Sequence, residues 1–213
     1  MSIWVLIPIF ILLISMTAGL LFFYIVSPLT KAERKKQIEE VASLLINFLL
    51  FIWVGKILLN LTVFFQDPLA ILAYPSNSHA FYIAVLLSGL TVLYKCIRKQ
   101  EKTFSTLFSF IPVFLVGSFV FEFIQLNLNK NPYTLVYLGL LVLLIVAFLL
   151  VQERIAPGKI AIIILSGWTA GQLFLAYVFP FVTVFGYLIA PWFLIVFYLV
   201  MTTLYVLKVN VSQ

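Results

Sequence analysis

Two charged side chains interrupt long apolar stretches of the sequence, and both are of types that can do chemistry. Glu122 lies in FVFEFIQLN, residues 119–127, and Lys56 lies in WVGKIL, residues 53–58. A charge in hydrocarbon costs about 2.5–3.5 kcal/mol on insertion scales, so such residues usually face a bundle interior or a cavity and have a partner. We therefore expect Glu122 and Lys56 to form an ion pair or to line one pocket. The alternative is that each side chain reaches the lipid headgroups separately.

Further polar side chains are expected at the same depth. With a helical rise of about 1.5 Å per residue, Lys56 would lie roughly 22 Å along its membrane span and Glu122 about 27 Å along another. Asn60 follows Lys56 by one helical turn, Gln125 follows Glu122 closely, and Gln172 lies in a later apolar stretch. Together these residues predict a polar pocket in the outer half of a helix bundle.

Acid–base or nucleophilic chemistry has few candidate residues in this sequence. The only histidine is His79, and Ser76 and Ser78 lie close to it. A nucleophilic hydroxyl needs a base held beside it, and an interfacial histidine that hydrogen-bonds backbone or water is the simpler interpretation. We assign no catalytic residue and keep Glu122 and His79 as candidates for an acid or a base. One histidine and one nearby aspartate are too few for a metal site, so we expect no metal and no cofactor.

The elements that must hold these residues are predicted to be membrane helices. Hydrophobic residues make up 64% of the 213 residues and charged residues 9%, against roughly 25% charged residues in soluble domains. The apolar runs approach the roughly 20 residues that cross a bilayer as a helix. They predict an all-α fold, a polytopic transmembrane helix bundle of about seven spans that forms a single integral membrane domain, residues 1–213. The expected spans are 3–27, 41–65, 79–95, 104–126, 134–152, 160–179 and 186–207.

Basic residues gather in alternate loops, which predicts the orientation of the bundle. Eleven of the 13 lysines and arginines fall on one side, whereas Lys130 lies in an opposite loop and Lys56 lies within a span. By the positive-inside rule, the N-terminus is expected outside and the C-terminus in the cytoplasm. The net charge of +6 is then a topology signal, and we expect no nucleic acid as a partner. The basic residues of the cytoplasmic side are Lys31, Arg34, Lys35, Lys36, Lys95, Arg98, Lys99, Lys102, Arg154, Lys159 and Lys208.

Two local patterns support the helical interpretation. Thr30 and Glu33 have the Thr-x-x-Glu spacing of a capping box, which predicts that a helix begins there and leads into the second span. Ser15, Thr17 and Gly19 are small residues within the first span. Small residues let membrane helices approach closely, so we expect tight packing of this span against a neighbour.

The order of these features resembles the bacterial prolipoprotein diacylglyceryl transferase family over roughly residues 20–207. In the second span, VGKI is similar to the family's Gly-Ala-Arg-Leu, with Lys56 at the arginine position. The loop DPLAIL, which begins at Asp67, is similar to Asp-Pro-Leu-Glu-Ile-Leu, and Pro112 and Gly117 keep the spacing that precedes the family's signature. The family is a seven-span enzyme with its N-terminus outside. The resemblance therefore implies the same architecture, as a multi-pass protein of the bacterial plasma (inner) membrane.

The positions of the family's chemistry carry other residues here. The family's Ser-Phe-His-Gly-Gly is AFYIA, which places Tyr82 at the histidine position and His79 one turn earlier. The signature Gly-Arg-x-Gly-Asn-Phe is FEFIQL, so Glu122 replaces the arginine and Gln125 the asparagine. Gln172 takes the place of the arginine in Arg-Phe-x-x-Glu. A carboxylate at an arginine position would repel the lipid phosphate that this reaction must hold, so the resemblance implies the scaffold without the reaction.

We interpret the chain as a catalytically degenerate relative of this family that binds a lipid or a lipoprotein segment in an outer-leaflet cavity. The expected partners are membrane phospholipid and, in addition, a lipoprotein or another membrane protein. One alternative is a membrane acyl- or lipid-transferring enzyme of altered specificity that uses Glu122 or His79. Another is a small-solute transporter along the layer of Lys56 and Glu122. The expected ligand-binding residues are Lys56, Asn60, Tyr82, Glu122, Gln125 and Gln172.

Overall fold

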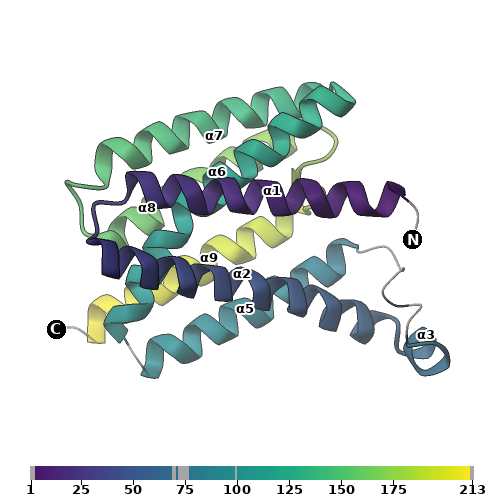
Figure 1. The fold of residues 1–213 in the computed structure, drawn as a ribbon, viewed down its shortest axis with the longest axis horizontal. Helices are drawn as coiled ribbons and strands as arrows, with labels where there is room; N and C mark the ends of the chain where they lie inside the picture. Colours follow the sequence, from purple (N-terminus) through teal and green to yellow (C-terminus); the bar gives the residue numbers. More distant parts are fainter. Residues whose placement is uncertain (1–2, 69–70, 72–76, 99, 212–213) are drawn as a thin grey trace.

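The computed structural model describes residues 3–68, 71, 77–98 and 100–211, which form an elongated bundle of helices (Figure 1). In this described part of the chain, eight helices and one two-stranded hairpin make up the regular structure. Each strand is only two residues long. The predicted all-α fold, a polytopic helix bundle, is therefore confirmed.

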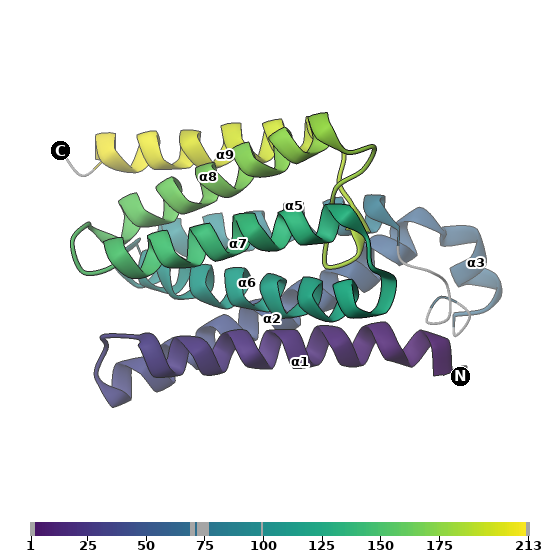
Figure 2. The same cartoon turned by 90° about the horizontal axis from the view of Figure 1, so that it is seen from above.

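Among the described residues, seven long helices run between the two ends of the bundle, one for each predicted span (Figures 1 and 2). A short helix, α3 (Leu61–Gln66), follows the second of them. The strands β1 (Thr183–Val184) and β2 (Tyr187–Leu188) join the last two. The long helices are α1 (Ile3–Val26), α2 (Lys31–Leu59), α5 (Ser78–Arg98), α6 (Gln100–Asn129), α7 (Pro132–Val151), α8 (Pro157–Val178) and α9 (Pro191–Val211).

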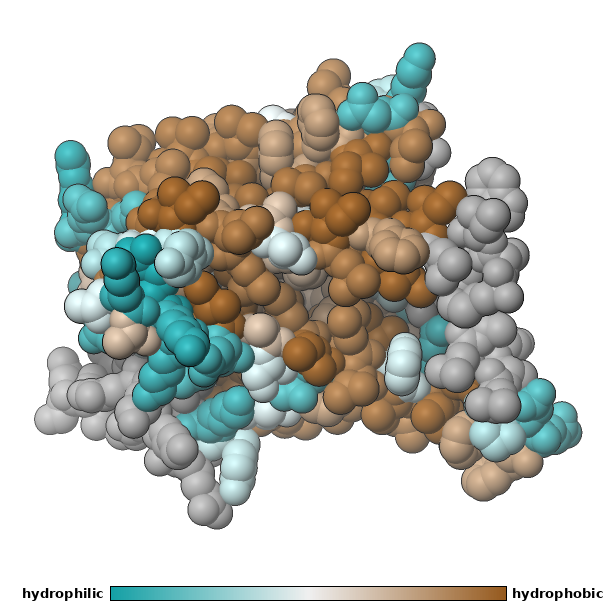
Figure 3. All heavy atoms as spheres, in the orientation of Figure 1, coloured by the Kyte–Doolittle hydropathy of each residue, from teal (hydrophilic) through white to brown (hydrophobic). Residues whose placement is uncertain are grey.

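The length and surface of these helices identify a membrane protein. Six of them (α1, α2, α5, α6, α7 and α8) are long and apolar enough to cross a membrane, and the apolar stretch found in the described part of α9 is Pro191–Val200. Figure 3 shows hydrophobic residues over the middle of the bundle and hydrophilic residues near its ends. Large apolar side chains such as Phe65 and Tyr177 are 80% and 90% exposed. An apolar surface of this extent requires lipid around it, so the protein is a multi-pass membrane protein.

One end of the bundle carries basic connections. The turn between α1 and α2 and the turn between α7 and α8 lie at the same end in both ribbon views (Figures 1 and 2). The sequence places Lys31 and Arg34 beside the first turn and Arg154 and Lys159 beside the second. We call this the basic end and the opposite one the hairpin end, because β1 and β2 lie there. That the basic end faces the cytoplasm stays a prediction.

Local chemistry explains where several helices begin and end. The capping box at α2 is confirmed, because the Glu33 amide donates to Thr30 Oγ1 at 3.4 Å and the Thr30 amide donates to Glu33 Oε2 at 3.2 Å. Asn131 caps α7 by accepting the Tyr133 amide at 3.1 Å. Arg34 donates to the carbonyl oxygens of Tyr24 and Ser27 at 2.7 and 2.8 Å. It thereby satisfies groups that the end of α1 leaves without helical partners.

The helix α6 lies at the centre and contacts α1, α2, α5, α7 and α8, while the main apolar core lies around α5 to α9. Small residues bring α1 and α6 close together. A Cβ on Gly19 would overlap the Val113 carbonyl group, and the Ser15 carbonyl oxygen would lie 3.3 Å from a Cβ on Gly117. Close packing of the first span is thus confirmed for Ser15 and Gly19, whereas Thr17 is exposed.

Two predicted spans differ from the structure at a boundary. The second was expected to continue to residue 65, but α2 ends at Leu59 and Asn60 separates it from α3. The last was expected from residue 186, but α9 begins at Pro191 and residues 186–190 belong to the hairpin connection. In both places an apolar composition continues through a bend of the backbone, so composition alone missed the break.

Candidate functional site

Lys56 lies near the hairpin end of α2, and only 8% of the residue is exposed. It continues a buried face on which Gly55 packs against α5, where an added Cβ would lie 2.9 Å from the Ala80 carbonyl oxygen. Asn60 ends α2 and donates its side-chain amide to the Lys56 carbonyl oxygen at 2.9 Å. No carboxylate of the described residues forms an ion pair with Lys56. Lys56 is therefore a buried cation close to the end of a membrane helix.

Glu122 lies on α6 and is 3% exposed. Its carboxyl group lies close to the hydroxyl of Thr134, which is buried in the first turn of α7. The rings of Tyr133 and Tyr137 are close enough to interact electrostatically with the carboxyl group. These two rings stack with their centroids 5.7 Å apart. Glu122 thus faces α7, and its partners are hydroxyl groups.

Gln172 completes this polar group from the third helix, α8, and is fully buried. The Tyr133 hydroxyl donates to Gln172 Oε1 at 3.4 Å, and Trp168 Nε1 donates to the Tyr137 hydroxyl at 3.1 Å. Gln172 also lies close to Tyr137, but its Nε2 has no partner with hydrogen-bond geometry among the described residues. We call Glu122, Tyr133, Thr134, Tyr137, Trp168 and Gln172 the Glu122 cluster.

A hairpin folds back from the α8–α9 connection toward α6 (Figure 2). Its strands are antiparallel, with Thr183 opposite Leu188 and Val184 opposite Tyr187. Phe185 and Gly186 form the turn with φ values of 50° and 82°. Two positive φ values are typical of the tight turns that suit the twist of a hairpin. Backbone outside a helix is tolerated at membrane depth only where protein or a water-filled space surrounds it.

Two tyrosine hydroxyls hold this hairpin in place. The Tyr133 hydroxyl accepts the Thr183 amide at 2.9 Å and lies 3.0 Å from the Thr183 carbonyl oxygen. The Tyr82 hydroxyl accepts the Ala190 amide at 2.8 Å and donates to the Leu188 carbonyl oxygen at 3.3 Å. Tyr82, which was expected to bind a ligand, therefore has hairpin backbone as its hydroxyl partner.

The remaining predicted residues have separate surroundings. His79 is exposed in the first turn of α5, and its ring lies edge-on to Tyr82 with a centroid distance of 6.0 Å. Gln125 is half-buried on α6, and Ser76 lies outside the described residues. No contact in the described part of the chain joins His79 to Glu122. The same part shows no group of three or more His, Cys, Asp or Glu residues that could hold a metal ion.

The residues of the single predicted polar pocket lie at two separate sites in the structure. Glu122 and Gln172 come together through Tyr133, whereas Lys56 and Asn60 lie on α2. No ion pair between Lys56 and Glu122 is present in the described residues. The physical reason is direction, because Lys56 lies on the face of α2 next to Gly55 and Ala80, while Glu122 points from α6 toward α7.

Sequence reasoning missed several members of the site. Tyr133, Thr134 and Trp168 lie in apolar stretches and carry no charge, so nothing in their type sets them apart from interfacial or lipid-facing residues. The hairpin had a usable signal, since VTVFGYL (residues 182–188) places β-branched residues before a glycine-containing turn.

A polar contact between α2 and α6 near the basic end was also missed. Gln37 Nε2 donates to Ser105 Oγ at 2.9 Å, and the Thr106 hydroxyl donates to Glu40. Gln37 and Glu40 lie in the charged stretch before the apolar part of α2, a composition that is typical of a solvated loop or helix end and does not predict a contact between helices.

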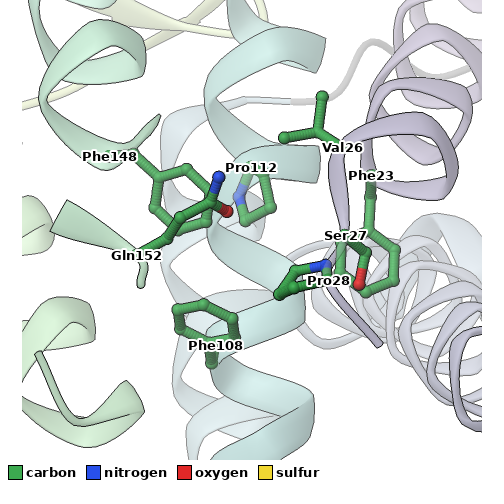
Figure 4. A pocket seen from close by; sticks show the side chains of 8 residues that line it. All are labelled: Phe23, Val26, Ser27, Pro28, Phe108, Pro112, Phe148 and Gln152. Carbon is green, nitrogen blue, oxygen red and sulfur yellow. The ribbon is translucent and has the colours of Figure 1, made fainter. Parts of the chain in front are cut away.

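The two best-formed hollows in the described structure lie away from the predicted ligand residues. The first has room for at most about one water molecule and lies between the end of α1, α6 and the end of α7 (Figure 4). The second is smaller still and lies between α8 and α9. Neither is lined by a residue of the expected ligand set. The residues around the first are Phe23, Val26, Ser27, Pro28, Phe108, Pro112, Phe148 and Gln152.

Comparisons with protein-family models, with curated proteins and with solved structures found no match to this chain. The site therefore has to be interpreted from its own geometry. That geometry consists of a buried cation on α2, and of a separate buried carboxyl group in a cluster of hydroxyl, amide and indole groups under a clamped hairpin.

Proposed function

We propose that this multi-pass membrane protein binds the anionic phosphate of a phospholipid, or of the lipid-modified segment of a lipoprotein, beside Lys56 without transferring a group. The observation that carries the proposal is the burial of Lys56, which is 8% exposed as a residue, without a described carboxylate partner. A buried cation is strongly stabilised by an anion and costly without one. A lysine is also a common point-charge ligand for phosphate.

The position of Lys56 along α2 supports a lipid as the source of this anion. Lys56 lies three residues before Leu59, the last residue of α2, which is about 4.5 Å along the helix axis. The end of a membrane helix lies near the headgroup region, where phospholipid phosphates are found. The surrounding surface is apolar, so acyl chains can pack beside the same helix.

The proposal leaves out catalysis because the candidate acid–base groups have separate surroundings. Glu122 is buried beside Thr134 on α7, while His79 is exposed on another helix. A carboxylate also repels the phosphate that a diacylglyceryl transferase must hold. The likeness of the sequence pattern to that family supports the same bundle in a bacterial plasma membrane, with lipid handling retained and the reaction lost.

Thermal unfolding with added lipid tests the proposal. Phosphatidylglycerol added to purified protein in neutral detergent should raise the Tm, since a ligand at about 100 times its Kd stabilises by about 2.7 kcal/mol. Lys56→Met should lose most of this rise, and Lys56→Arg should keep it because the positive charge remains. Lys130→Gln is the matched control, since Lys130 is an exposed cation in the connection between α6 and α7 at the hairpin end.

The result that contradicts the proposal is a full lipid-dependent rise in Tm for Lys56→Met. A fall of the rise in Lys130→Gln as large as in Lys56→Met would show general charge attraction in place of a site. Phosphatidylcholine, added in parallel, reports the contribution of the acyl chains alone.

A further inference from the structure

We propose that the hairpin connection of residues 182–190 is a hinged cap, and that its opening exposes Glu122, Tyr133 and Gln172 as a second binding site for a hydrogen-bonding group. This inference goes beyond the lipid site at Lys56 and does not depend on it. It rests on the contacts of the hairpin, the unpartnered amide beneath it and the conformation of its turn.

The cap is held by few polar contacts at two points. On one strand the Thr183 backbone meets the Tyr133 hydroxyl, and on the other side Leu188 and Ala190 meet the Tyr82 hydroxyl. Its own closing hydrogen bond joins the Ile189 amide to the Val182 carbonyl oxygen at 2.9 Å. Val182, Val184 and Ile189 of the hairpin also lie in the main apolar core. The hairpin therefore moves as a unit only when these apolar contacts and the tyrosine contacts are released together.

Tyr133 couples the cap to the cluster. Its single hydroxyl hydrogen has two acceptors within reach, the Thr183 carbonyl oxygen at 3.0 Å and Gln172 Oε1 at 3.4 Å. A hydroxyl can donate only once, so the closed cap and the cluster compete for the same proton. When Thr183 moves away, the Tyr133 hydroxyl can donate its hydrogen bond to Gln172 or to an incoming ligand.

Gln172 shows that the closed arrangement leaves hydrogen-bonding capacity unused. Its amide nitrogen is buried without a partner in the described structure. An unsatisfied buried donor is costly, and native proteins usually fill such a position with water or ligand. Tyr133 relates it to the Glu122 carboxyl group, which has more acceptor positions than the Thr134 hydroxyl can fill.

The turn of the hairpin stores strain that favours movement. Phe185 has a φ of 50° although it is not glycine, a conformation that costs about 1 kcal/mol or more for a bulky residue and persists only when its surroundings hold it. The ring is held against α6 by Phe114 and Phe121, at centroid distances of 6.0 and 5.6 Å. These apolar contacts keep the cap closed.

The groups that the open cap would expose define the chemistry of a ligand. The Gln172 amide donates a hydrogen bond, and the Glu122 carboxyl group accepts one or attracts positive charge. The Tyr133 hydroxyl can donate or accept a hydrogen bond. A hydroxyl or a protonated amine complements this set, since each can donate to the carboxyl group. A phosphate does not, because the carboxylate would repel it. The second site is therefore distinct in charge preference from the site at Lys56.

Cysteine labelling in lipid nanodiscs tests the cap. Cys96 is the single cysteine of the sequence, so Cys96→Ser gives a background without thiols. In this background Gln172→Cys reports on the cluster through its rate of reaction with a water-soluble maleimide, and Thr134→Cys is a second reporter. Tyr82→Phe removes one clamp without touching the cluster and should raise the rate about tenfold, since one lost set of hydrogen bonds shifts a local opening by that order. Tyr177→Phe, a change at a 90% exposed tyrosine, should leave the rate unchanged.

A further reporter separates local from general opening. Ser109→Cys is fully buried on α6, and its labelling rate should stay low in every variant. Faster labelling at residues 172 and 134 with unchanged labelling at 109 supports the cap. Equal acceleration at all three positions would show that Tyr82→Phe loosens the whole bundle, and an unchanged rate at 172 and 134 would show a fixed hairpin. Either of these two results overturns the proposal.

Discussion

At the scale of single residues, the two intramembrane charges have different roles. Glu122 lies within the protein close to hydroxyl groups of α7. Lys56 has no such set of described partners and lies close to the end of its helix. The same residue property, charge in an apolar stretch, thus marks an internal cluster in one case and a proposed anion site in the other.

A double-mutant cycle distinguishes these separate roles from a direct pair. We expect Glu122→Gln and Lys56→Met to have additive effects on the free energy of unfolding, within about 0.5 kcal/mol, because their partners differ. Unfolding by sodium dodecyl sulfate in mixed micelles measures all four proteins. A coupling energy of about 1–3 kcal/mol would contradict this expectation and would restore the ion pair that the sequence predicts.

The residue scale also shows what the sequence reveals about the site. Glu122, Gln172 and Lys56 stand out by type, so polarity in an apolar stretch was sufficient to find them. Their partners did not follow, because which face of a helix points to which neighbour depends on the packing of all the helices. Tyr133 illustrates this limit, since its sequence position suggests an interfacial tyrosine and its hydroxyl instead serves Thr183 and Gln172.

At the scale of elements, the contact between α1 and α6 depends on the absence of side-chain atoms. Gly19 faces the backbone of Val113, and backbone cannot move aside as a flexible side chain can. The pattern of small residues was visible in the sequence, whereas the partner helix was not. The hairpin between α8 and α9 shows a second limit, because an apolar composition concealed the short strands and the turn.

Substitution of two glycines tests the close approach of α1 and α6. Gly19→Ala should destabilise the bundle by about 1–3 kcal/mol, because its Cβ forces the helices apart. Gly139→Ala is the control, since no atom lies within 4 Å of a Cβ at that helical position. It should be neutral or stabilise by up to about 1 kcal/mol through helix propensity. Equal effects of the two changes in chemical unfolding would show that the α1–α6 contact carries no packing constraint.

At the scale of the whole molecule, composition and apolar periods were enough to predict a helix bundle in a membrane. The seven predicted spans each correspond to one long helix in the described structure. This success has a simple cause, because a bilayer forces backbone hydrogen bonds inside each segment and so fixes the element type. Function is not forced in the same way, and it depends on a few contacts that the lipid does not dictate.

Orientation is the first prediction at this scale. We expect the basic end to face the cytoplasm, because positively charged loops are retained there. An impermeant maleimide applied to intact cells should label Lys130→Cys at once and Glu153→Cys only after permeabilisation, both in a Cys96→Ser background. Both residues are exposed and lie in connections at opposite ends of the bundle. The reverse pattern would contradict the orientation.

The second prediction at this scale is that the protein does not catalyse diacylglyceryl transfer. Purified protein mixed with labelled phosphatidylglycerol and a lipobox peptide should give no diacylglyceryl transfer, because the Glu122 carboxylate would repel the lipid phosphate. An active member of that family serves as the positive control in the same vesicles. Transfer by the unmodified chain would overturn the proposal of a non-catalytic protein. A Glu122→Arg, Gln125→Asn variant asks whether the scaffold can regain the reaction.

The position of the hairpin also has a consequence for biosynthesis. Its contacts come from α5, α6 and α7, yet it is made after α8 and before α9. It cannot be seated while the ribosome is still producing the earlier helices. Until the hairpin packs against α5, α6 and α7, it does not cover the Glu122 carboxyl group and the Gln172 amide. The nascent bundle therefore exposes polar groups at membrane depth. Burial of the polar interior is therefore a late step of assembly, which follows the synthesis of α8 and the hairpin.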